Sequence, residues 1–324
     1  MFIRRDVIKM LGLAGIATVA GTRTSFAQAY PSQPITIIVP YAPGATDQEA
    51  RTLARIMEKT LKQPIQVENR AGGGATIGAN FVARSKPDGY TLLYVASIPI
   101  TVSPYIRKLP YGYESFRPIA QGTQGTHLVV ARADAPFKTL AEMLAYAKAN
   151  PGKISMGNSG GTGGATHLAN EAMAAQAGIK LNHIPFEGLS QSVAALLGGV
   201  LDLATGLPIS LMPQVEAGKL RTIAQMGAVR SPLLPDVPAF KEAGVDLDLN
   251  VSLGLYAPHD LPKDIVEKLA STMKEAVASP DFKEYADKVR TVPQFRGPDE
   301  FAAGIEAERK LFAGLVPKLN IKVE

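Results

Sequence analysis

Short apolar runs and longer stretches of helically spaced apolar residues alternate along this chain. A run of four to seven residues rich in Ile, Val, Leu, Thr and Tyr, bounded by turn residues, is typical of a buried strand. Segments of this kind lie at 35–39, 65–68, 91–96, 127–131, 153–156, 200–205, 220–226 and 252–257. Because helical patterns fill the gaps between them, the sequence predicts an α/β fold with mostly parallel sheets.

The first helix pattern follows the strand at 35–39 directly. Its apolar residues recur at i, i+3, i+4, i+7 and i+11, at Ala50, Leu53, Ala54, Met57 and Leu61. We expect Thr46 or Asp47 to cap this helix. A second apolar helix is expected over 168–177.

Three further helices have clear end signals. Thr139 followed by Glu142 is a capping box, and that helix should end before Asn150 and Pro151. Another helix is expected over 263–278. The last is expected over 298–319, with its apolar residues toward a core, namely Phe301, Ile305, Leu311, Phe312 and Leu315.

Two of the strand-to-helix junctions are rich in glycine and small polar residues, at 41–47 and 157–167. Backbone N–H groups at a helix start have no intrahelical partner and lie at the positive end of the helix dipole, so they suit a carboxylate or phosphate. Glycine lets the backbone approach a ligand, and Ser and Thr hydroxyls add neutral donors. An ordinary corner or a flexible linker has a similar composition, but two facing loops of this kind predict an anion-binding cleft.

The first residues have the pattern of an export signal. Arg4 and Arg5 precede an uncharged apolar stretch at 10–21, and small-x-Ala sites end at Ala27 and at Ala29. We therefore expect a signal peptide over 1–27 and a mature chain that starts at Gln28 or Tyr30. The paired arginines also resemble a twin-arginine signal, so the export route stays open. No segment is long enough to span a bilayer, so a soluble periplasmic protein is expected.

The charge and the cysteine content further restrict which kinds of protein this chain can be and which partners it can bind. The chain has no cysteine, which leaves neither a disulfide framework nor a lipid-anchored cysteine. Its formal net charge is +5, but four basic residues and one acid lie in the expected signal peptide, so the mature part carries only a small positive charge. No basic run interleaved with aromatic residues is present, which argues against a nucleic-acid partner. A monomer with no cofactor is expected.

Roughly 300 mature residues are enough for two domains with separate cores. The chain can cross between two lobes in exposed extended segments, and the candidates are 118–126 and 249–258. This places one discontinuous lobe at 28–124 and 250–324 and a second lobe at 125–249.

A set of short motifs is spread in order over essentially the whole mature chain. They are Pro40-Tyr41-Ala42-Pro43-Gly44 with Asp47, Val67-Glu68-Asn69-Arg70, Pro87-Asp88-Gly89-Tyr90, Ser159-Gly160-Gly161-Thr162-Gly163, His167-Leu168-Ala169 with Glu171, Leu196-Leu197-Gly198-Gly199, Ala217-Gly218-Lys219-Leu220-Arg221 and Leu234-Pro235-Asp236-Val237-Pro238. Together these motifs resemble the Bug family, the solute receptors of tripartite tricarboxylate transporters.

The resemblance implies a two-lobed periplasmic binding protein of the Venus-flytrap type II fold, with a central sheet in each lobe and a two-strand hinge. It implies that a small carboxylate is held between the lobes by loop amides and ordered waters rather than by an arginine. It also implies delivery to the membrane permease subunits of the transporter, without catalysis. A sensor that passes its liganded form to a membrane kinase has the same fold and remains an alternative.

Carried over residue by residue, the resemblance places the ligand against two loops, a serine between them and a segment that closes the side of the cleft. The expected ligand-binding residues are Tyr41, Ala42, Pro43, Gly44, Ala45, Thr46, Asp47, Ser97, Ser159, Gly161, Thr162, Gly163, Thr166, His167, Phe186, Glu187 and Gly188. The first loop is shorter than in most family members, and Gly164 stands where a serine is common. Both departures predict a ligand pose that differs from the usual one.

Two other functions have partial sequence support. Residues 157–161 satisfy the G-x-S-x-G pattern, with Asp236 and His259 in hydrolase order, but the glycine-rich residues that follow Ser159 do not suit a nucleophile elbow. The glycines at 72–78 suggest a nucleotide loop, yet the acid at 88 precedes its strand rather than ending it, so a hairpin or βα turn is preferred.

The four histidines, at 127, 167, 183 and 259, are scattered along the sequence, so no metal site is expected.

Overall fold

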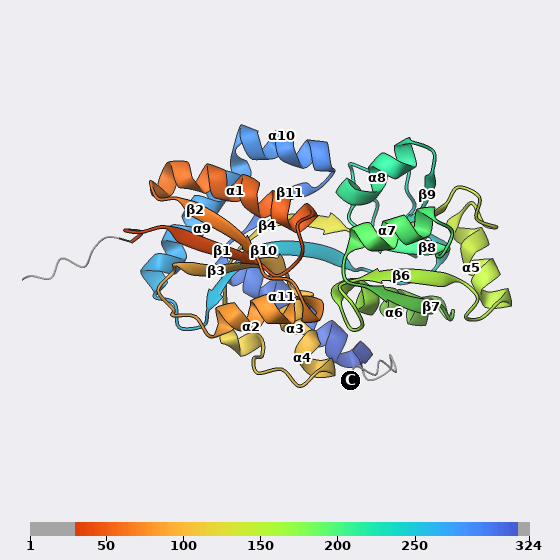
Figure 1. Cartoon of the computed structure of the whole chain (residues 1–324), viewed down its shortest axis with the longest axis horizontal. Helices are drawn as coiled ribbons and strands as arrows, with labels where there is room; N and C mark the ends of the chain where they lie inside the picture. Colours follow the sequence, from red (N-terminus) through yellow and green to blue (C-terminus); the bar gives the residue numbers. More distant parts are fainter. Residues whose placement is uncertain (1–29, 317–324) are drawn as a thin grey trace, which may run out of the picture. The chain divides into compact units, whose positions relative to one another are not determined.

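The computed structural model describes residues 30–316, which form two β-sheets with helices packed on them (Figure 1). The larger sheet has the spatial order β11-β4-β10-β3-β1-β2. Its strands are β1 Ile35–Val39, β2 Ile65–Asn69, β3 Thr91–Ala96, β4 Phe116–Thr126, β10 Asn250–Pro258 and β11 Val292–Arg296. β1 pairs in parallel with β2 and β3, whereas β10 is antiparallel to β3 and β4, and β11 is antiparallel to β4.

The second sheet has the spatial order β7-β6-β8-β5-β9. Its strands are β5 Leu128–Arg132, β6 Ser155–Ser159, β7 Asn182–Phe186, β8 Leu203–Gly206 and β9 Leu220–Gln225. β6 pairs in parallel with β7 and β8, whereas β5 is antiparallel to β8 and β9. The α/β fold is confirmed, but the expectation of mostly parallel sheets is wrong, because both sheets are mixed.

The helices and 3-10 turns occupy the connections between strands. The α-helices are α1 Ala45–Leu61, α2 Thr76–Ala83, α3 Ile98–Thr101, α4 Ser103–Ile106, α5 Leu140–Ala149, α6 Ala165–Ala177, α7 Leu189–Leu197, α8 Pro208–Glu216, α9 Lys263–Ala278, α10 Pro280–Val289 and α11 Pro298–Leu315. The 3-10 turns are η1 Gly73–Ala75, η2 Tyr113–Ser115 and η3 Phe240–Ala243. None of the helices within residues 30–316 is long and apolar enough to cross a membrane.

Two helix starts test the capping predictions. The backbone N–H of Glu142 donates to the Thr139 hydroxyl at 3.2 Å, which confirms the cap of α5. The predicted cap of α1 is wrong, because this helix begins at Ala45 with Gly44 as its N-cap and no side chain caps it. The Asp47 carboxylate instead accepts from Arg51 one turn later, at 3.0 Å.

Apolar residues of both sheets pack against their helices. On the larger sheet, Ile38, Leu93 and Tyr256 pack with Phe301 of α11, as the final helix pattern predicts. Phe312 of the same helix belongs to the core of the second sheet. The predicted continuation of α11 to 319 lies outside the described residues.

Strand β4 is followed at once by β5, so the chain passes from the larger sheet to the second sheet at His127. The chain returns at β10, whose Asn250 is in register with Thr126 of β4. Within the described part of the chain, the strands of the second sheet therefore lie between residues 128 and 225. The exact lobe boundaries at 124/125 and 249/250 stay a prediction.

Candidate functional site

A cavity of about 420 Å³ lies among the loops that follow strands of both sheets. This volume is within the range of small-molecule sites. Its wall includes the segments before and at the starts of α1, α6 and α7, together with part of β10. The cavity is therefore formed by connections from both sheets.

Among the helices that begin at the cavity wall, α1, α6 and α7 have glycine as their N-cap. Gly44 precedes α1, Gly164 precedes α6 and Gly188 precedes α7, and none of these caps offers a side-chain acceptor. The first backbone hydrogen bond of each helix is made by its fourth residue, for example from Gln48 N to Gly44 O at 2.9 Å. The first-turn N–H groups thus remain available to a ligand, at the positive ends of three helix dipoles.

The wall carries little charge. Neither lysine nor arginine occurs among its described lining residues. Burial raises the pKa of Tyr41 and lowers that of His127 to about 4, so both are neutral near pH 7. Glu187, which is exposed, is the acidic residue of the lining. Backbone dipoles are therefore the main source of positive potential.

The cavity brings together many of the residues that the sequence predicts for the site. Those on its wall are Tyr41, Ala42, Pro43, Gly44, Ala45, Thr46, Ser97, Ser159, Thr166, Glu187 and Gly188. Those that do not line it are Asp47, Gly161, Thr162, Gly163, His167 and Phe186. Whether the first group binds the ligand stays a prediction.

The second predicted loop differs from the sequence expectation in its length. Strand β6 continues to Ser159, so the loop itself covers only 160–164. A Cβ atom on Gly164 would lie 2.4 Å from the Gly160 carbonyl oxygen. This close approach explains why a side chain is excluded at Gly164, where a serine is common in the family. The Ser159 hydroxyl lies 3.3 Å from that of Thr166, and neither Asp236 nor His259 is among its described hydrogen-bond partners.

A third loop, at 71–75, also lines the cavity, although its sequence is not predicted as a binding element. It contributes Ala71, Gly72, Gly74 and Ala75 to the lining. A Cβ atom on Gly74 would lie 3.1 Å from the Gly160 carbonyl oxygen, so this loop touches the second loop. Its glycine run directly after a strand is the same signal that marks the other two loops. It is a βα turn, one of the two alternatives preferred from the sequence.

The Arg107 side chain forms hydrogen bonds to both the second and the third loop. Its guanidinium donates to the carbonyl oxygen of Gly73 at 2.8 Å and to that of Thr162. These loops follow strands of different sheets, so one side chain spans the two halves of the cavity wall.

Further wall residues also escaped the sequence analysis because no local motif marks them. They come from the strand crossing, the first turn of α7, the end of β8, the start of α8 and the first half of β10. These residues are His127, Leu189, Ser190, Gln191, Gly206, Leu207, Ser210, Asn250, Val251 and Leu253.

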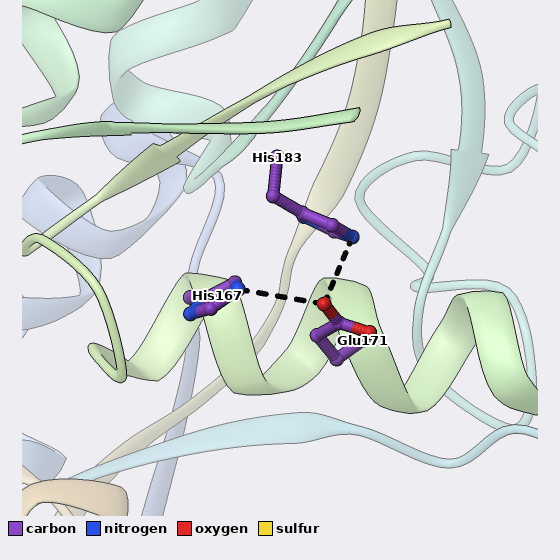
Figure 2. Close-up of side chains that lie close together, drawn as sticks. All are labelled: His167, Glu171 and His183. Carbon is purple, nitrogen blue, oxygen red and sulfur yellow. Dashed lines mark ion pairs between the residues drawn. The ribbon is translucent and has the colours of Figure 1, made fainter. Parts of the chain in front are cut away.

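Two of the four histidines, which are far apart in the sequence, lie close together in the structure, contrary to the expectation that the histidines form no cluster. Figure 2 shows His167 and Glu171 of α6 beside His183 of β7. Glu171 Oε1 lies 3.5 Å from His167 Nε2 and 3.4 Å from His183 Nε2. His167 and Glu171 are four residues apart and share a helix face, which the sequence could have shown.

These three side chains offer ligand atoms within 4.8 Å of one another, as a metal ion needs. Their hydrogen bonds favour another role. Gly163 N–H donates to His167 Nδ1 at 2.9 Å. The Asn158 amide oxygen accepts from Asn170 at 2.6 Å, which turns its amide nitrogen to His183 Nδ1 at 3.1 Å.

Both Nδ1 atoms therefore accept, so each neutral ring carries its proton on Nε2, which faces Glu171. A metal ion would have to displace both protons. The hydrogen bond from His167 lowers the pKa of Glu171, and burial lowers that of His183. The cluster is best described as a carboxylate between two imidazoles, one of which anchors the second loop through Gly163.

The mixed two-sheet α/β fold with a cavity between connections of both sheets is the architecture of two-lobed solute-binding proteins. The model of the tripartite tricarboxylate transporter family receptor matches residues 49–302. The UPF0065 protein in the gbd 5′ region of Cupriavidus necator is 35% identical, over 98% of each chain. The BugT protein of Bordetella pertussis is 30% identical over 98% of this chain and 100% of its own length. This chain belongs to the tripartite tricarboxylate transporter receptor family, which confirms the resemblance to Bug proteins.

Solved structures show the same fold. A periplasmic transporter, 37% identical, has a TM-score of 0.84 and covers 91% of this chain and 100% of its own. The periplasmic binding protein BugD, 32% identical with the same coverage, has a TM-score of 0.82. MatC from Rhodopseudomonas palustris with bound malate, 28% identical, has a TM-score of 0.81 and covers 89% of this chain and 100% of its own.

Proposed function

We propose that this solute-binding protein is exported to the periplasm, captures a small carboxylate in the cavity and delivers it to the permease subunits of a tripartite tricarboxylate transporter. One observation carries the choice of ligand. The N-termini of α1, α6 and α7 meet at one cavity whose described lining has no lysine or arginine.

Backbone donors of this kind are sufficient for a carboxylate. A hydrogen bond to a charged group contributes about 1.5–3 kcal/mol, and each helix dipole adds about 0.3–1 kcal/mol. A few such bonds, some through water, give micromolar affinity, which corresponds to about 8 kcal/mol. The malate bound to MatC, a member of the same fold with 28% identity, supports a carboxylate ligand.

The proposal is tested by thermal unfolding of the purified mature protein with a panel of mono-, di-, tri- and aromatic carboxylates. A ligand at 100 times its Kd adds about 2.7 kcal/mol to the free energy of unfolding. Since each kcal/mol raises Tm by about 2–4 °C, a shift of at least about 5 °C is expected. The corresponding amide should give a much smaller shift, because N–H groups at helix starts favour a charged acceptor. Equal shifts by acid and amide would reject the anion site, and no shift across the panel would contradict the function.

Export is tested separately by N-terminal sequencing of periplasmic protein. The expected first residue is Gln28 or Tyr30, after the small-x-Ala sites. Recovery of the intact chain from the cytoplasm alone would contradict the proposed location.

A further inference from the structure

His127 is a buried side chain on the cavity wall whose imidazole has no described partner. It lies between β4 and β5, where the chain crosses from one sheet to the other, and only 6% of its surface is exposed. Its backbone is well fixed, since its carbonyl oxygen accepts from Met226 N–H at 2.9 Å. The ring is thus held at the cavity by the strand crossing and not by hydrogen bonds of its own.

The two ring nitrogens differ in access. Nδ1 is enclosed and has no hydrogen-bond partner within residues 30–316. Nε2 makes no described hydrogen bond either, but it is not among the enclosed unpartnered atoms, so it retains surface, and the residue lines the cavity. A ligand can therefore reach Nε2 and not Nδ1.

This difference fixes which proton the ring carries. A second proton would place an N–H on enclosed Nδ1, where no acceptor is available, and burial accordingly lowers the pKa of His127 to about 4. The neutral ring uses its single proton best on Nε2, where a ligand can accept it. A ligand oxygen at this position would accept a hydrogen bond from the one ring nitrogen that a ligand can reach.

We propose that His127 is a specificity-determining residue of the cavity, whose Nε2–H donates a hydrogen bond to a second oxygen-bearing group of the ligand, such as a hydroxyl, carbonyl or second carboxyl group. This inference rests on the proposed function and deepens it. In the proposed function the helix starts hold the first carboxylate, whereas His127 lines the cavity from the strand crossing, directly after Thr126, which is in register with Asn250 of β10. A neutral donor suits any of these oxygens, because it adds direction without charge.

The test measures calorimetric affinity for three acids of equal chain length: hexanoate, 6-hydroxyhexanoate and adipate. The wild-type protein should bind the last two about 3- to 10-fold more tightly than hexanoate, the gain of one neutral hydrogen bond. His127→Leu should abolish this preference while hexanoate still binds. His127→Gln, whose amide nitrogen can take the place of Nε2, should restore most of it. His259→Leu, at an exposed position, serves as the matched control and should keep the wild-type preference.

Each result separates the two proposals. Hexanoate binding without any wild-type preference, or a preference that survives in His127→Leu, overturns the role of His127 and leaves the carboxylate site intact. If none of the three acids binds, this inference is contradicted. If no acid of the whole carboxylate panel binds, the proposed function is contradicted as well. If His127→Leu does not fold, the wild-type preference and the His127→Gln variant still decide.

Discussion

Glu49 is a buried acid that should make the stability of this protein depend on pH. It lies on α1 with 3% of its surface exposed, and its Oε1 accepts from the hydroxyls of Thr123, at 2.6 Å, and Tyr94. No cation is among the causes that shift its titration, and burial raises the pKa of Glu49 to about 7. The folded state therefore favours the protonated carboxyl.

The magnitude follows from the two pKa values. The usual pKa of 4.5 applies in the unfolded chain, against about 7 in the folded state. Each tenfold change in proton affinity corresponds to about 1.4 kcal/mol, so the ionised folded state is destabilised by about 3 kcal/mol. This loss is absent below pH 4.5, grows as the pH rises and is complete above pH 7.

Glu49→Gln tests this reasoning, because the amide oxygen can still accept from Tyr94 and Thr123. A cavity of about 20 Å³ beside Glu49 has room for one water to bind the amide nitrogen. We expect the Tm of Glu49→Gln to exceed that of the wild type by about 5–10 °C at pH 8 and to match it within about 2 °C at pH 5.

Glu267→Gln is the control, since Glu267 is exposed on α9 and pairs with Lys263 at 3.6 Å. This variant should show no such pH-dependent gain. Calorimetric unfolding at both pH values decides the matter. A Glu49→Gln variant that is no more stable than the wild type at pH 8, or that differs equally at both pH values, would refute the buried ionised carboxylate.

Two further predictions concern the loops. Gly163→Val should weaken the affinity for a carboxylate by about 5- to 100-fold, because Gly163 has φ of 74° and anchors the second loop. Gly218→Val carries the same backbone cost at φ of 70° outside the cavity, so equal affinities of the two folded variants in calorimetry would exclude the loop. Arg107→Met should weaken binding by about 3- to 10-fold, since it releases two loops that form the wall. Arg84→Met, on the exposed end of α2, should not, and unchanged affinity of Arg107→Met would contradict the bridging role.

Elements with strong local signals could be predicted from the sequence. Strands β1 and β3 and helix α9 have the predicted bounds, because β-branched runs or helical spacing and proline-marked ends agree there. The sequence predicts a crossing segment at 118–126 and no strand there, because the polar and glycine residues at 121–125 do not resemble a strand. The pairing of β4 with β10 and β11 on either side overrides that local preference.

In the candidate site, too, residues with a local sequence signal could be predicted, and residues placed by long-range strand pairing could not. The loops at 41–46 and 159–166 are local signals, and their residues reach the cavity. His127 carries no local signal, because its importance depends on the strand crossing that brings β4 beside β10. Likewise, His183 meets His167 only because β7 pairs with β6, the strand that precedes α6. Contacts set by strand pairing over long sequence separations cannot be read from spacing alone.

The charge distribution around the cavity suits a protein that must both bind and release an anion. A lysine or arginine in the wall would attract anions of any shape, whereas backbone N–H groups act only over a short range and in fixed directions. The donors of α1 follow a strand of the larger sheet, and those of α6 and α7 follow strands of the second sheet. If the proposed carboxylate binds all three helix starts, it receives the full set of donors only when both sheets present them at once. Its affinity would then depend on the relative placement of the two sheets, and a change in that placement would release the ligand without removing any charge from the site.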